Sequence, residues 1–60
     1  MKLFEYMKPS VFKSLELSQQ RFISKVIMRE VKEVSAERDI SEKEAYECLA
    51  KGLYTGDREI

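Results

Sequence analysis

Neither glycine nor proline occurs between Ser10 and Lys51, a stretch of 42 residues in a chain of 60. Pro9 stands directly before this stretch and Gly52 directly after it. These two residue types interrupt α-helices more strongly than any others. The chain is therefore predicted to be all-α, with helices joined by short turns, and its length allows one small domain spanning residues 1–60.

The apolar residues in the first part of this stretch recur at helical spacings of three, four and seven. They are Phe22, Ile23, Val26, Ile27, Val31 and Val34. Such spacings belong to one face of an α-helix and do not fit the alternation of a strand. Ser18 is the favoured N-cap, because its hydroxyl can accept a hydrogen bond from an early amide, and Ser10 is the alternative start. We predict a long helix over about residues 19–36.

A second helix is predicted by its two ends. Ser41 has the position of an N-cap, and Glu44, three residues later, can reach back to the Ser41 amide. Gly52 suits the left-handed residue after a helix, with Leu53 folding back as its apolar contact. The expected buried side consists of Ala45, Tyr46, Leu49 and Leu53. This predicts a helix over about residues 41–52.

The two helices together form a helical hairpin within residues 18–53. Residues 1–17 form an N-terminal segment in which Pro9 ends any first helix and pushes Lys8 toward extended geometry. Residues after Pro9 either form a separate short helix or continue into the long one. We thus expect one or two short N-terminal helices packed across the hairpin, and a frayed tail over residues 54–60 because its composition is that of a turn.

The net charge is zero, since 11 basic residues balance 11 acidic ones, but the charges are unevenly distributed. A basic stripe recurs along the long helix at spacings of four, four and three: Arg21, Lys25, Arg29 and Lys32. Like charges four residues apart cost an isolated helix about 0.2–0.5 kcal/mol per pair. Acids of the second helix, an acidic partner protein or phosphates could compensate this cost, or the stripe is simply solvated.

The apolar face of the long helix is also wider than the ~100° that one packing partner covers. The excess consists of Ile27, Met28 and Val31. These three residues are predicted either to bind a partner or to be covered by the apolar residues of the N-terminal segment. Association is favoured by the small core of so short a chain.

Residue types needed for most catalysis and metal binding are missing. The chain has no histidine, a single cysteine, Cys48, and no glycine-rich phosphate loop. We therefore expect no enzyme activity, no cofactor, no metal site and no small-molecule substrate. No run approaches 18 apolar residues, and Glu5 interrupts the apolar start, so we expect no membrane association and a cytoplasmic location with Cys48 reduced.

These features favour a small non-catalytic protein–protein interaction module or regulator, such as an adaptor, an inhibitor or an antitoxin-like protein of bacterial or phage type. It would bind a larger partner, or itself, through a helix face. The alternative is a nucleic-acid-binding, helix-turn-helix-like regulator that uses the basic stripe. Acidic residues at Glu42, Glu44 and Glu47 count against it, because the second helix would have to approach phosphates.

Overall fold

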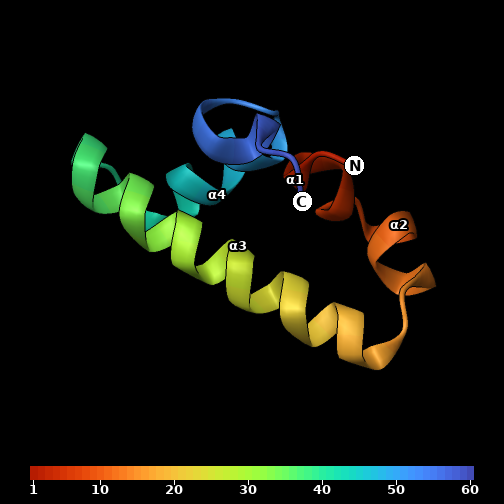
Figure 1. Ribbon diagram of the computed structural model, residues 1–60. Coiled ribbons are helices and arrows are strands. Elements are labelled where there is room, and N and C mark those ends of the chain that lie inside the picture. The colour runs from red at the N-terminus through yellow and green to blue at the C-terminus, as the bar shows by residue number, and fades with distance from the viewer.

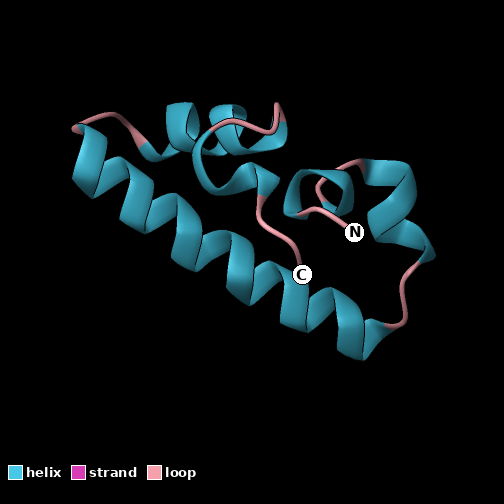
Figure 2. Ribbon diagram, turned by 45° about the horizontal axis from the view of Figure 1, so that its top comes forward, coloured by secondary structure: helices cyan, strands magenta, loops and turns pink.

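The computed structural model describes all 60 residues and is entirely helical apart from turns and one isolated β-bridge (Figures 1 and 2). The elements, in order, are α1 (Leu3–Tyr6), α2 (Pro9–Ser14), α3 (Leu17–Arg38), α4 (Glu42–Ala50) and the 3-10 helix η1 (Tyr54–Asp57). The α3 and α4 helices pack against each other as a hairpin. The predicted all-α class and helical hairpin are confirmed.

The long helix α3 sets the shape of the molecule. Its 22 residues span about 33 Å at 1.5 Å per residue, which matches the longest dimension of the structure, 33 × 17 × 17 Å. All other elements lie on one side of α3, with α4 over its C-terminal half and α2 at its N-terminal end (Figures 1 and 2). One side of the long helix is therefore covered and the other is open.

The start of α3 differs from the prediction. Its N-cap is Glu16, and the Glu16 amide donates to Oε1 of Gln19 at 3.1 Å. The side-chain amide of Gln20 donates to the backbone carbonyls of Phe12 and Leu15, each at 3.1 Å. These bonds hold a turn between α2 and α3, so α2 is a separate helix. The prediction of Ser18 as the N-cap was wrong. The side chains of Gln19 and Gln20 bond to the turn before α3, and the helix begins at Leu17 with Glu16 as its N-cap.

Both ends of α4 follow local rules. The Ser41 hydroxyl accepts from the Glu44 amide at 3.1 Å, which confirms the predicted N-cap. Gly52 has a φ of 82°, and the amides of Gly52 and Leu53 donate to the carbonyls of Leu49 and Cys48 at 3.0 Å each. This is the Schellman pattern that ends a helix. Leu53, however, is 50% exposed, so the expectation that it lies on the buried side was wrong.

The core joins α1, α3 and α4. It consists of Leu3, Met7, Val26, Val31, Val34, Ala45 and Leu49, with Ile27 and Ile40 packed against it. Phe22 and Tyr46, both expected on buried faces, are 58% and 45% exposed. The covered side of α3 runs through Ile23, Val26, Glu30 and Val34, and the Phe22 side chain lies outside it. That expectation was therefore wrong for both aromatic residues.

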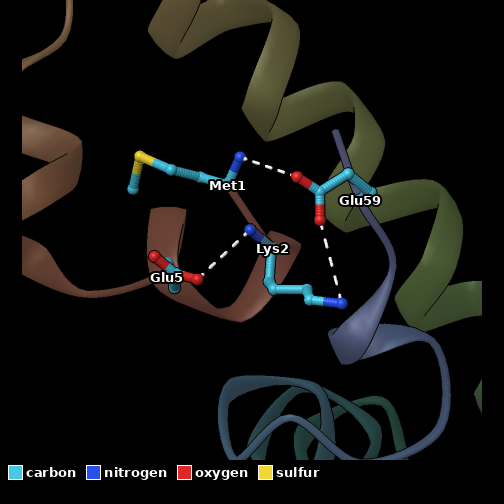
Figure 3. Close-up of polar contacts among 4 residues, drawn as sticks. All are labelled: Met1, Lys2, Glu5 and Glu59. Atoms are coloured by element: carbon cyan, nitrogen blue, oxygen red, sulfur yellow. Dashed lines mark hydrogen bonds and ion pairs between the residues drawn. The ribbon is translucent and has the colours of Figure 1, made fainter.

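The C-terminal tail is ordered, which corrects the expectation that it frays. After η1 it forms a β-bridge with the N-terminus: the Leu3 amide donates to the Arg58 carbonyl at 2.8 Å, and the Ile60 amide to the Met1 carbonyl at 3.0 Å. The Met1 ammonium lies 3.1 Å from Glu59 Oε1, and Lys2 Nζ lies 3.8 Å from its other oxygen (Figure 3). Turn composition alone could not reveal this pairing, because its partner is at the other end of the chain.

A buried carboxylate fastens the tail to α3. Glu30 is 1% exposed, and its Oε1 accepts a hydrogen bond from the Arg58 guanidinium. Arg29 Nη2 lies 3.6 Å from the same oxygen. A buried carboxylate is costly unless it is paired and hydrogen-bonded. Arg58 therefore connects the tail to the covered side of the long helix.

Candidate functional site

Two adjoining hollows form an apolar groove on the surface. The larger, about 460 Å³, lies between α2, α3 and α4, and the smaller, about 280 Å³, lies between α3 and α4. Ile27, Met28 and Tyr46 line both hollows, and Met7, Pro9 and Phe12 complete the apolar wall of the larger one. We call this surface the α2–α4 groove.

The position of α2 leaves the groove open. Lys8 is extended, with a ψ of 129°, as the sequence predicted, and Pro9 occupies the first turn of α2. The helix packs mainly on α1 rather than on α3, so Phe12 lines one wall while Met28 lines the other. Met28 remains 59% exposed and Tyr46 45% exposed. The N-terminal segment thus borders the wide apolar face of α3 without covering it.

The three predicted apolar contact residues have different positions. Ile27 lines the groove and packs against the core, and Met28 lies on its open wall. Val31 lines the smaller hollow but is only 7% exposed and belongs to the core. Its predicted role as an exposed contact is corrected, because the packing of α3 against α4 covers this position.

Sequence reasoning missed two aromatic members of the groove. Phe12 was assigned to a covering segment, and Tyr46 to the buried side of α4. Glu42 stands four residues before Tyr46, so both lie on the same flank of α4, which lines the groove. A charged residue on that flank is the signal that could have indicated that Tyr46 is exposed. Aromatic side chains and methionine are enriched in protein interfaces, because aromatic rings offer a large rigid contact area and the flexible methionine side chain adapts to the shape of a partner.

All four residues of the predicted basic stripe are exposed, but they differ in their ion pairs. Arg29 forms an ion pair with Glu30, whereas Arg21, Lys25 and Lys32 form none. The acidic residues of α4 form no ion pair with any of the four stripe residues, although Glu42 lines the same hollow as Lys32. The cations that remain free are those on the side of α3 that carries Met28.

A separate hollow of about 260 Å³ lies on another part of α3. Its apolar lining includes Tyr6, Leu15, Phe22, Ile23 and Ile60. The exposure of Phe22 is explained by this position, since the tail and α1 come close to the ring without covering it. This hollow is smaller than the α2–α4 groove and contains none of the predicted site residues.

Reactive groups are scattered rather than gathered. Cys48 is a free, half-buried thiol, and no group of three or more cysteine or acidic side chains could hold a metal ion. None of the helices combines the length and the apolar run needed to cross a bilayer. The fold and the groove define a small all-α protein with an open apolar surface beside unpaired cations.

Comparison with known proteins adds no relative to this description. No protein-family model, no curated protein and no solved structure matches the chain.

Proposed function

We propose that this protein is a non-catalytic interaction module or regulator that binds a larger protein through the α2–α4 groove. The observation that carries the proposal is the exposure of Met28 and Tyr46 on the walls of a concave apolar surface of about 460 Å³. Contiguous exposed apolar surface bordered by polar residues is typical of binding sites in small soluble proteins. A concave surface between helices suits a convex partner such as a helix.

The groove favours a protein partner over nucleic acid. Lys13 and Lys32 are the only cations in a lining that is otherwise mostly apolar, which suits apolar side chains better than a phosphate backbone, and Glu42 in the smaller hollow repels phosphate. We also propose a cytoplasmic location. Cys48 is the only cysteine, so the fold contains no intramolecular disulfide, and proteins of the reducing cytoplasm rarely contain one.

Site-specific photocrosslinking in the producing cells tests the proposal. A photoreactive phenylalanine analogue replaces Met28 in one variant and Leu53 in the matched control, because both side chains are about half exposed and only Met28 lines the groove. We expect a crosslinked product with another protein from position 28 only, and its loss when Tyr46→Lys is added. Equal products from both positions, or none from position 28, would contradict the proposal.

A further inference from the structure

We infer that the partner presents an amphipathic helix with apolar side chains on one face and carboxylates along an edge of that face. This inference rests on the proposed function and specifies the chemistry of the partner. It is carried by the arrangement of charges around the apolar walls of the groove.

Free cations border the apolar wall formed by α3. Lys25 stands three residues before Met28, Lys32 four residues after it and Arg21 seven residues before it, so all three share its side of the helix. All three are exposed and without an ion pair, and Lys32 itself lines the smaller hollow. An apolar helix seated on Met28 would therefore lie beside a row of positive charge.

The opposite wall adds a further cation. Lys13 of α2 lines the larger hollow, and it also forms no ion pair. The single acidic residue in the lining is Glu42, at the α4 end of the smaller hollow. Most of the groove thus offers positive charge on both edges of an apolar floor. Complementary potentials of this kind select the partner and steer its approach.

A second copy of the chain fits this surface poorly. Two α3 helices packed antiparallel about a twofold axis present the same flank on the same edge of the interface. The rows of Arg21, Lys25 and Lys32 from both copies would then face each other without an acid between them. Each copy would also bring a hollow where the other needs a convex surface. The charges and the shape therefore point to a different, acidic partner.

Fluorescence anisotropy with two synthetic probes tests this inference. The first probe is a labelled peptide of about 18 residues, long enough to form a helix, with leucines on one face and glutamates along its edges. The second has lysines in place of the glutamates and the same leucines. We expect the full chain to bind the glutamate peptide about tenfold more tightly, since two or three exposed ion pairs each contribute a few-fold. Added salt should reduce this difference.

Charge reversal on the protein provides the matched control. Lys25→Glu combined with Lys32→Glu should reverse the preference in favour of the lysine peptide. Arg38→Glu combined with Lys51→Glu makes the same charge change at exposed cations that line neither hollow and stand neither three nor four residues from Met28 or Tyr46, and should leave the preference unchanged. Circular dichroism of both double variants checks that they keep their helices.

The possible outcomes separate the inference from the proposed function. Equal binding of both peptides, with loss of both in Met28→Lys, overturns the acidic partner and leaves the groove as a binding site. Binding that survives Met28→Lys overturns the groove itself, with Leu53→Lys as the exposure-matched control. Displacement of the glutamate peptide by a duplex oligonucleotide, or a stable dimer that excludes the peptide, also overturns the inference.

Discussion

Replacing Gly56 by alanine should destabilise the protein by a predictable route. Gly56 is buried, and a methyl group added at its Cα would overlap the carbonyl oxygen of Leu49. The same methyl carbon would lie 2.9 Å from the carbonyl carbon of Leu49 and 3.0 Å from the Leu49 Cα atom. All three obstacles are backbone atoms of α4, so no side chain can rotate away. Leu49 is itself 0% exposed, and its carbonyl accepts the Gly52 amide. Relief therefore requires η1 to move off α4.

The size of the effect follows from what such a movement disturbs. Overpacking a close contact typically costs about 1–3 kcal/mol. A domain of this length has a total stability of roughly 3–9 kcal/mol, so the change is a large part of it. Movement of η1 also pulls on Arg58, which neutralises the buried Glu30. We expect a loss of about 2–3 kcal/mol in Gly56→Ala, near the upper end of that range.

Urea unfolding followed by far-ultraviolet circular dichroism measures this change, and Gly52→Ala is the matched control. At Gly52 the added methyl group would meet only the Phe4 ring at 3.4 Å, an ordinary contact, although its φ of 82° strains a non-glycine residue by about 1 kcal/mol. Gly56→Ala should therefore be the more damaging change. A Gly56→Ala variant within about 0.5 kcal/mol of the parent protein would refute the argument.

Three further predictions concern the tail and the groove. Arg58→Ala should lower the free energy of unfolding by about 1–3 kcal/mol, because it leaves Glu30 buried without its partner, and adding Glu30→Leu should recover part of the loss in the same urea assay. The N-terminal ammonium, first by its hydrogen bond and then by its charge, lowers the pKa of Glu59 below the ordinary 4.5. The ionised Glu59 carboxylate therefore stabilises the fold above pH 4.5, and this stabilisation is lost as pH falls through the folded pKa. In an NMR titration, N-terminal acetylation should return the pKa of Glu59 toward 4.5. Met28→Lys should change stability by less than about 0.5 kcal/mol, whereas Val31→Lys should unfold the protein, as a thermal melt would show.

Local rules account for the parts of the fold that were predicted. The Ser41 cap and the Gly52 turn depend on hydrogen bonds that join residues no more than five positions apart. A few consecutive residues therefore determine the geometry of the Ser41 cap and of the Gly52 turn. The extended Lys8 before Pro9 is set in the same way, by a steric contact between neighbours.

The site was predicted only in part. Helical spacing identified Ile27 and Met28 as part of a surplus apolar surface. It set the basic stripe across from much of the apolar face, whereas Lys32 lines the smaller hollow together with Met28. It could not distinguish exposed Met28 from buried Val31, since both lie on that wide face. Which of the two α4 covers depends on how the helices pack, and spacing along one helix carries no such information.

Contacts between distant residues account for the rest. The tail is ordered by residues 1–3, and Glu30 is neutralised by Arg58, 28 positions away. The α2–α4 groove likewise depends on the position of α2, whose first turn holds Pro9 and whose C-terminal end is tied to the start of α3 by the Gln20 bonds. Sequence patterns report the intrinsic preferences of short segments. The free energies that order the tail, bury Glu30 and open the groove arise only when separate segments meet, so they belong to the assembled fold.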